Sequence, residues 1–98
     1  NAVGGIRIAE TSGDLPLLLA VVSSLRNKVL PKDLVVFGEG GLTGEIRPVD
    51  SGQERNTKAA KHGFTRSIVP KGNAPRTNIT GIMVQPVSRL DEAIALFD

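Results

Sequence analysis

Hydrophobic and polar residues alternate at the start of the chain and then give way to a long apolar block. The alternation over residues 3–9 predicts a strand, with the Gly4-Gly5 pair as a bulge or kink. After a polar break at 10–14, apolar residues at helical spacing predict a helix that runs to about Asn27. Because apolar residues cover most sides of this helix, we expect it to be buried by a sheet and by other helices or subunits. Its main stripe consists of Leu15, Leu18, Leu19 and Val22.

Glycines and β-branched residues dominate the middle of the chain. Residues 33–37 and 45–49 predict two strands. The four glycines between them favour a hairpin turn over a phosphate-binding loop, since no Lys-Ser/Thr pair follows. A helix is predicted over residues 51–62, because Ser51 and Glu54 have the spacing of a capping box and a glycine follows the end.

The last third of the chain predicts two more strands and a final helix. The strands cover residues 66–70 and 81–85, a mobile polar loop covers 71–79 between them, and the helix covers 90–97. The order β-α-β-β-α-β-β-α indicates an α/β (α+β) fold in which helices pack on a mixed sheet. No linker or internal repeat divides the chain, so we expect residues 1–98 to belong to one domain.

Composition is that of an ordinary folded domain, with 40% hydrophobic and 22% charged residues in a chain of 98. The longest apolar run, residues 15–22, is far shorter than the ~20 residues that span a bilayer. The chain has no cysteine, which excludes disulfides and thiolate metal sites, and its only aromatic residues are three phenylalanines, which disfavours base stacking on single-stranded nucleic acid. A start without methionine favours a piece of a larger protein.

Positive charge is concentrated in residues 47–76, where seven Lys/Arg side chains stand against two carboxylates. Such a segment can bind the phosphates of DNA, contact an acidic flank of a neighbouring subunit, or be a solvated surface. The pattern leaves these three interpretations open. The seven cations are Arg47, Arg55, Lys58, Lys61, Arg66, Lys71 and Arg76.

Several motifs keep a fixed order along almost the whole chain. They are the start and end of the first helix, Glu10-Thr-Ser-Gly-Asp-Leu15 and Val21-Val-Ser-Ser-Leu25, followed by Asp33-Leu-Val-Val-Phe-Gly-Glu39, Gly44-Glu-Ile-Arg-Pro-Val49, Ser51-Gly-Gln-Glu-Arg55, Ala59-Ala-Lys-His-Gly63 and Ile68-Val-Pro70. In this order they resemble the C-terminal part of the bacterial RadA/Sms family of DNA-repair proteins.

The resemblance implies a Lon-protease-like domain of the ribosomal S5 domain 2-like type that lacks its N-terminal strands. The zinc-binding cysteines and the ATPase core of RadA/Sms proteins are not in the sequence. ATP, magnesium and zinc are therefore implied only for other domains of the parent protein, and no cofactor or metal is implied for this one. The family further implies a cytoplasmic, ATP-dependent motor for DNA repair and recombination. It would form a homo-hexameric ring on branched or single-stranded DNA, without a membrane partner, and this domain would be its assembly scaffold and a candidate DNA-contact surface.

The resemblance to Lon also identifies the two positions of a catalytic dyad. The Lon nucleophile lies in a Pro-Ser-Ala-Gly run, to which Thr11-Ser12-Gly13-Asp14 corresponds here. The Lon general base is the second lysine of a Lys-Glu-Lys or Arg-Glu-Lys run, 43 residues after the serine. An ungapped match places Gln53-Glu54-Arg55 on that run, so that Arg55 occupies the position of the base.

Arginine is unsuited to the role of a general base. A Ser–Lys dyad needs a lysine that can lose its proton near neutral pH. The guanidinium group has five donors, no acceptor and a pKa above about 12, and bringing that pKa to neutrality would need ~5 units, or about 7 kcal/mol. We therefore expect a pseudo-protease with no enzymatic activity in this domain. The alternative is a residual serine peptidase or esterase that uses Ser12.

Each of these positions also has a structural interpretation. Ser12 can be a helix cap, and Arg55 can form an ion pair with Asp14 or Glu39, or contact a phosphate. The single histidine, His62, is the only substitute base, but it lies two helical turns beyond Arg55 and is favoured at a helix C-terminus by the helix dipole.

Overall fold

The computed structural model describes residues 2–3, 6–7, 15–41 and 43–97. The elements in chain order are β1 (Ala2–Val3), β2 (Ile6–Arg7), α1 (Leu15–Leu25), β3 (Leu34–Val36), β4 (Glu39–Gly40), β5 (Ile46–Arg47), α2 (Gly52–Lys61), β6 (Arg66–Pro70), the 3-10 turn η1 (Lys71–Asn73), β7 (Met83–Val87) and α3 (Leu90–Ala95).

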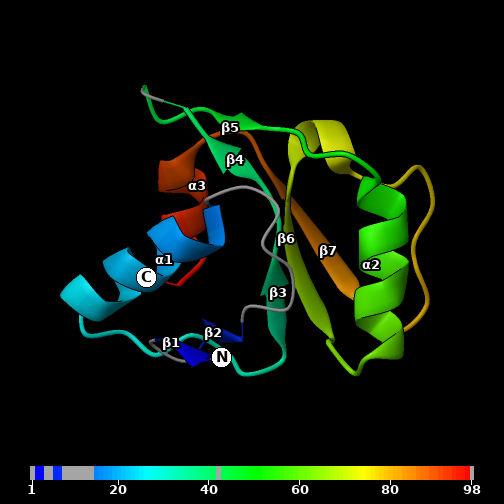
Figure 1. Cartoon of the computed structure of the whole chain (residues 1–98), viewed down its shortest axis with the longest axis horizontal. Helices are drawn as coiled ribbons and strands as arrows, with labels where there is room; N and C mark the ends of the chain where they lie inside the picture. The colour runs from blue at the N-terminus through cyan, green and yellow to red at the C-terminus, as the bar shows by residue number, and fades with distance from the viewer. Residues whose placement is uncertain (1, 4–5, 8–14, 42, 98) are drawn as a thin grey trace.

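A parallel sheet of three strands, in the order β3-β6-β7, lies between the helices (Figure 1). Helices α1 and α3 cover one face of this sheet and α2 covers the other. The predicted α/β architecture with helices packed on sheets is confirmed. Parallel and antiparallel pairs are divided among separate sheets, because β1-β2 and β4-β5 form two small antiparallel ribbons beside the parallel sheet.

Side chains alternate between two cores along the buried strands, as strand geometry requires. On the α1 and α3 face, Leu34, Val36 and Ile68 pack with residues of α1 and with Val87. On the α2 face, the intervening residues pack with Ala59 of α2 and with its neighbours Phe64 and Ile82. The buried strand residues on this second face are Val35, Phe37 and Val69.

The first helix agrees with its prediction. It begins at Leu15, which places Pro16 in the first turn, where its missing N–H costs little. Leu15, Leu19 and Ala20 are buried against the sheet and α3, whereas Val21 and Leu25 are exposed. One side of α1 is therefore open in this chain, although the sequence predicts burial on several sides. None of the described helices is long and apolar enough to cross a membrane.

The predicted N-terminal strand over residues 3–9 is wrong. Instead, β1 and β2 pair with each other antiparallel, with Ala2 opposite Arg7 and Val3 opposite Ile6. Alternation of apolar and polar residues indicates extended backbone, but it does not specify which segment that backbone pairs with. The Gly4-Gly5 pair, predicted as a bulge, lies outside the described residues.

The hairpin predicted between residues 33–37 and 45–49 does not form, and the second of these segments forms a hairpin with another strand. β5 pairs with β4, while β3 pairs in parallel with β6. Gly38 makes this exit possible: its φ is 144°, and a Cβ there would lie 2.9 Å from Leu15 Cδ2. Glycine tolerates both conditions, so the chain can leave the central sheet beneath α1 and begin a new ribbon.

The segment after β6 is more regular than the predicted mobile loop. It begins with η1, and Asn73 at the end of that turn bonds the backbone of Val49 in both directions. The following strand is also displaced, since β7 begins at Met83 rather than at residue 81. The polar composition of this segment indicated a loop but contained no sign of the distant contact that holds its start.

Candidate functional site

Arg55, at the predicted position of the base, lies in the first turn of α2. Its backbone N–H bonds the carbonyl of Ser51 (3.0 Å), and its Nε donates to the carbonyl of Asp50 (2.6 Å). The side chain is half-buried and folded back onto the residues that precede the helix. The other dyad position, Ser12, lies outside the described residues, as does the predicted ion-pair partner Asp14. Among the described residues, Nε of the guanidinium group contacts the backbone carbonyl of Asp50, just before α2.

The capping box predicted at Ser51 is wrong. Ser51 has left-handed backbone angles (φ 59°, ψ 42°) and its side chain makes no capping bond. A capping serine needs extended angles to aim its oxygen at the N–H groups of the first turn. Glu54 is therefore not the reciprocal partner of Ser51. The predicted end of the helix is confirmed, with exposed His62 at the C-cap.

Asn73 fixes the approach to α2 from the other side. Its Oδ1 accepts the N–H of Val49 (2.8 Å) and its Nδ2 donates to the carbonyl of Val49 (2.8 Å). The same side chain lies against Gly52, where a Cβ would be 2.7 Å from Nδ2. Only glycine fits there without displacement. Asn73 was not predicted as a site residue, because an asparagine in a polar loop has no local signal for a partner 24 residues away.

A polar pair is buried between α2 and the sheet. Asn56 is 0% exposed and Ser67 is 1% exposed, and the hydroxyl of Ser67 donates to Oδ1 of Asn56 (2.5 Å). The Nδ2 of Asn56 has no hydrogen-bond partner in the described part of the chain. This pair was not predicted either. A signal was present, since Gly52, Asn56 and Ala59 recur at helical spacing on the buried side of α2.

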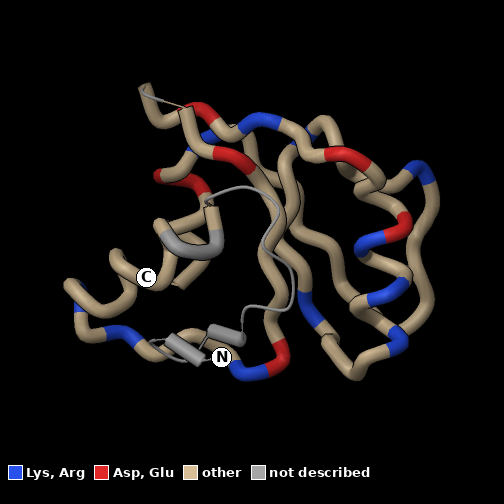
Figure 2. Tube along the Cα trace, viewed as in Figure 1, with Lys and Arg blue, Asp and Glu red and all other residues tan. Residues whose placement is uncertain are grey.

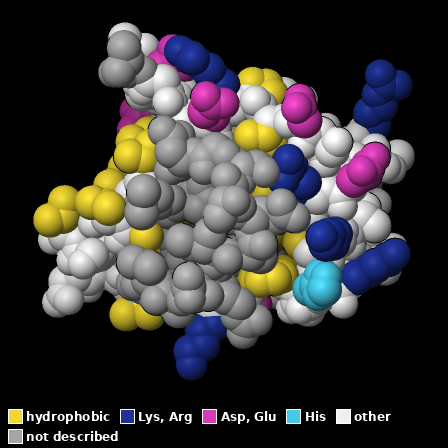
Figure 3. Space-filling model, in the orientation of Figure 1, with side chains coloured by type: hydrophobic (Ala, Val, Ile, Leu, Met, Phe, Trp, Pro, Cys, Tyr) yellow, Lys and Arg dark blue, Asp and Glu magenta, His cyan; other side chains and the backbone are white. Residues whose placement is uncertain are grey.

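The seven cations of residues 47–76 are not all brought together (Figure 2). Arg55, Lys58 and Lys61 follow one another along α2. Lys58 and Lys61 line a shallow depression on its outer face, together with Gln53, Glu54 and Thr57. A second depression continues from Thr57 and Lys61 to the loop at Ile79 and Thr80. We call Lys58 and Lys61 the α2 basic face; Figure 3 shows basic side chains gathered over α2. The other four lie elsewhere, Arg47 on β5, Arg66 at the start of β6, Lys71 in η1 and Arg76 in the loop that follows.

Carboxylates gather at a different place, where the β4-β5 hairpin meets the start of α3. We call Glu39, Glu45, Asp91 and Glu92 the acidic corner. Two backbone bonds join the segments, from Ile46 N–H to the carbonyl of Ser88 (2.9 Å) and from Leu90 N–H to the carbonyl of Gly44 (2.8 Å).

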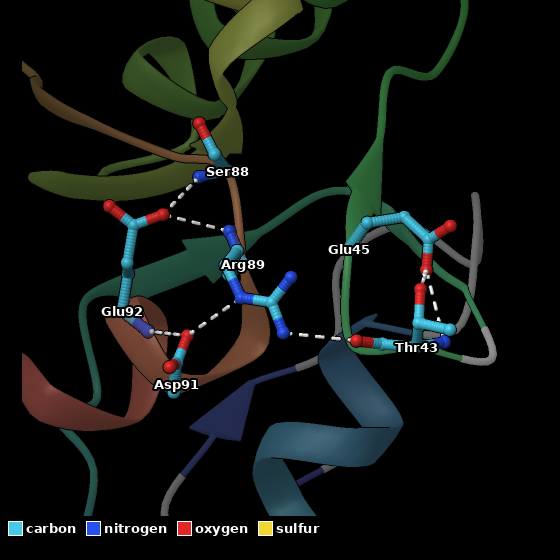
Figure 4. A network of polar contacts seen from close by, with 6 residues as sticks. All are labelled: Thr43, Glu45, Ser88, Arg89, Asp91 and Glu92. Atoms are coloured by element: carbon cyan, nitrogen blue, oxygen red, sulfur yellow. Dashed lines mark hydrogen bonds and ion pairs between the residues drawn. The ribbon is translucent and has the colours of Figure 1, made fainter.

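Side-chain contacts reinforce this junction (Figure 4). Arg89 donates from Nη2 to the carbonyl of Thr43 (3.0 Å) and approaches Asp91 (3.6 Å). Glu92 accepts the N–H groups of Ser88 and Arg89, each at 2.8 Å, and so caps α3. Backbone and side-chain hydrogen bonds thus hold the two segments of the acidic corner together.

Glu45 carries a perturbed carboxyl group within this corner. The hydroxyl of Thr43 donates to its Oε1 (2.8 Å), and this bond, with the backbone N–H groups of Glu45 and Thr43, holds the pKa of Glu45 below its ordinary value of 4.5. Arg47 contributes further, with Nη2 3.6 Å from Glu45. The corner therefore keeps its negative charge to lower pH than a free glutamate would. In the described residues, no three His, Asp or Glu side chains are grouped so that they could hold a metal ion.

Comparison with known proteins gives two results. The family model of subunit ChlI of Mg-chelatase matches residues 3–73. The whole chain is also 58% identical to the DNA repair protein RadA of Haemophilus influenzae and 59% identical to that of Escherichia coli, and 96% of it is 44% identical to that of Aquifex aeolicus. The chain spans about a fifth of the length of these relatives, 21% in each case. The predicted resemblance to RadA proteins is confirmed over the full chain.

Proposed function

This chain belongs to the family of subunit ChlI of Mg-chelatase, and from that membership and its similarity to RadA proteins we propose that it is the non-proteolytic scaffold domain of a RadA-type DNA-repair ATPase. The observation that carries the scaffold role is the separation of the acidic corner from the α2 basic face. In a ring, one surface of each subunit meets a different surface of its neighbour, and opposite charge on the two surfaces suits that arrangement.

Arg55 supports the absence of proteolysis. A guanidinium group has no lone pair with which to accept the proton of a serine, and its Nε is engaged by the carbonyl of Asp50. Binding and assembly need no such base, so the exchange of lysine for arginine removes the chemistry without removing the surfaces.

The test is a charge-reversal cycle in the full-length parent protein, followed by sedimentation velocity. We expect Lys58→Glu with Lys61→Glu to lower the hexameric fraction, and the further change Glu39→Lys with Asp91→Lys to restore part of it, because the reversed surfaces again attract. Arg76→Glu, which changes an exposed cation outside both surfaces, is the control. Hexamers that survive deletion of the whole domain would refute the scaffold role.

Direct DNA contact through the α2 basic face is a second candidate, favoured by the two lysines and the shallow depressions beside them. Each phosphate neutralised adds about −0.9 to the slope of log affinity against log salt. Lys58→Glu with Lys61→Glu should then weaken DNA binding and make that slope shallower, and reversal of the acidic corner should not restore either. Unchanged affinity and slope would exclude DNA contact at this face.

A further inference from the structure

An apolar stripe runs along the open side of α1 and onto the turn that follows it. Val21, Leu25 and Val29 are spaced four residues apart and are 48%, 81% and 84% exposed. Figure 3 shows hydrophobic side chains standing out over α1. We call these three residues the α1 stripe. Large aliphatic side chains grouped on a surface in this way are typical of a protein–protein contact, whereas single exposed ones are ordinary.

The turn that carries Val29 has a defined conformation. Asn27 adopts a left-handed φ of 55°, Lys28 N–H bonds the carbonyl of Ser23 (2.9 Å) and Asn27 N–H bonds that of Ser24 (3.2 Å). This is a Schellman termination of α1. The hydroxyl of buried Ser23 adds a bond to the carbonyl of Lys28 (2.6 Å). The α1 stripe is therefore pre-formed, and a partner would not have to order it on binding.

A small depression lies on the same part of the molecule, between α1, the turn and α3. Its apolar lining includes Leu19, Val22, Leu30, Ile94 and Phe97. At about 20 Å³ this depression has room only for a water-sized group, so the row of aliphatic side chains is the surface on which an amphipathic helix can dock.

Positive charge predominates along the segment that carries the α1 stripe. Residues 21–32 include the exposed Lys28 and Lys32 and no carboxylate, and the carboxylate of the next residue, Asp33, accepts the hydroxyl of Thr65. A symmetric contact between two copies through this surface would bring the two sets of cations together. In the described residues, Met83 is the other strongly exposed apolar side chain, while Leu96 is 36% exposed. The strand partner of Met83 is the exposed Arg66. A second copy therefore lacks, in its described part, an apolar surface with acidic flanks to match.

We propose that the α1 stripe binds an amphipathic helix with an aliphatic stripe and acidic flanks, supplied by a partner other than a second copy of this domain. This contact goes beyond the proposed ring contact, which uses the acidic corner and the α2 basic face. The aliphatic residues supply the affinity, and Lys28 and Lys32 select acidic flanks over basic ones.

Binding of designed peptides to the chain tests the proposal. One synthetic peptide has leucines at helical spacing flanked by glutamates, and its twin has lysine in place of every glutamate. By fluorescence anisotropy we expect the glutamate peptide to bind at least about tenfold more tightly than its twin, and more weakly as salt rises. Leu25→Gln with Val29→Gln should weaken it about tenfold or more, and Lys28→Glu with Lys32→Glu should reverse the preference.

Met83→Gln is the matched control, because it removes another strongly exposed apolar side chain (66%) from a different surface and should leave binding unchanged. All substituted side chains are exposed, so thermal unfolding of every variant should match that of the parent chain. Equal binding of the two peptides, equal loss in Met83→Gln, or binding to anionic lipid vesicles without binding to the peptide would overturn the proposal. A dimer of the chain that Leu25→Gln with Val29→Gln dissociates would also overturn it. Since the ring contact uses other surfaces, the α1 stripe variants should leave the hexameric fraction of the parent protein unchanged. Failure of the helix-binding proposal can therefore be distinguished from failure of the proposed ring contact.

Discussion

The two faces of the central sheet are filled by different kinds of contact. The face under α1 and α3 is packed with aliphatic residues such as Leu34, Val36 and Ile68. The face under α2 has an apolar core too, but a serine of β6 and an asparagine of α2 meet within it, and an asparagine of η1 holds the approach to the helix. This difference indicates that the position of α1 depends mainly on the shape and volume of its packed side chains, whereas the position of α2 depends also on directional hydrogen bonds.

The largest effect should come from the aliphatic face. Leu34→Ala removes a side chain that is 1% exposed, and we expect it to lower the free energy of unfolding by about 2–5 kcal/mol, because it leaves a cavity. Leu25→Ala is the matched control, since Leu25 is 81% exposed, and should change it by less than about 0.5 kcal/mol. Similar losses in the two variants, measured by urea unfolding, would contradict the assignment of Leu34 to the core.

The polar pair under α2 should show coupling that an aliphatic core would not. Ser67→Ala leaves the buried Oδ1 of Asn56 without its donor, and we expect a loss of about 1–3 kcal/mol. Adding Asn56→Leu to Ser67→Ala should recover much of this loss, because both polar partners are then gone. Strictly additive losses in this double-mutant cycle would show that the two side chains act independently.

Replacing Ser51, the left-handed residue before α2, with glycine should have a smaller effect of opposite sign on the free energy of unfolding. Ser51→Gly removes a steric cost of about 1–2 kcal/mol and adds a backbone-entropy cost of about 0.5–1 kcal/mol. The net expectation is a stabilisation of about 0.5 kcal/mol. Ser24→Gly, the same exchange at an exposed position within α1, should be destabilising by a similar amount. Equal effects at both sites would contradict the strained conformation of Ser51.

Two exposed carboxyl groups make the stability of the chain depend on pH, independently of the two cores. The pKa of Asp33 is lowered, mainly by the hydroxyl of Thr65, and that of Glu45 mainly by the hydroxyl of Thr43. A lowered folded pKa contributes stability above the ordinary values of 3.8 and 4.5, and this contribution is lost as pH falls through the folded pKa. Unfolding free energy should therefore decline below about pH 5, and less steeply in Asp33→Asn with Glu45→Gln. Glu54→Gln, for a carboxylate elsewhere on the surface, is the control.

The smallest expected effect is none at all. Arg55→Lys places a lysine at the position of the base, yet we expect no cleavage of casein, since Thr11 and Asp14 also depart from the Lon pattern around Ser12. Labelling by an active-site serine probe that Ser12→Ala abolishes would instead favour the residual peptidase or esterase.

Local pattern was a good guide wherever a segment makes its own structure. The strand over residues 66–70 has the predicted limits, and α1 and α3 each end two residues before their predicted C-terminal ends. Strand alternation and helical spacing are properties of neighbours two to four residues apart, so a single sequence contains them. The capping signal misled because serine followed by glutamate at the right distance occurs at Ser51, whereas the cap that forms uses Glu92 in the first turn of α3.

By itself, the sequence determined the α/β order of elements, the resemblance to RadA proteins and the presence of arginine where a Ser–Lys dyad needs lysine. Tertiary structure decided which strands pair, and it brought Asn56 to Ser67 and Asn73 to Val49. It also separated the cations of residues 47–76 and formed the acidic corner from segments 46 residues apart, joined by Thr43 and Arg89. The physical reason is that these contacts join residues far apart in the chain, and their energy depends on geometry that exists only once the sheet has brought them together.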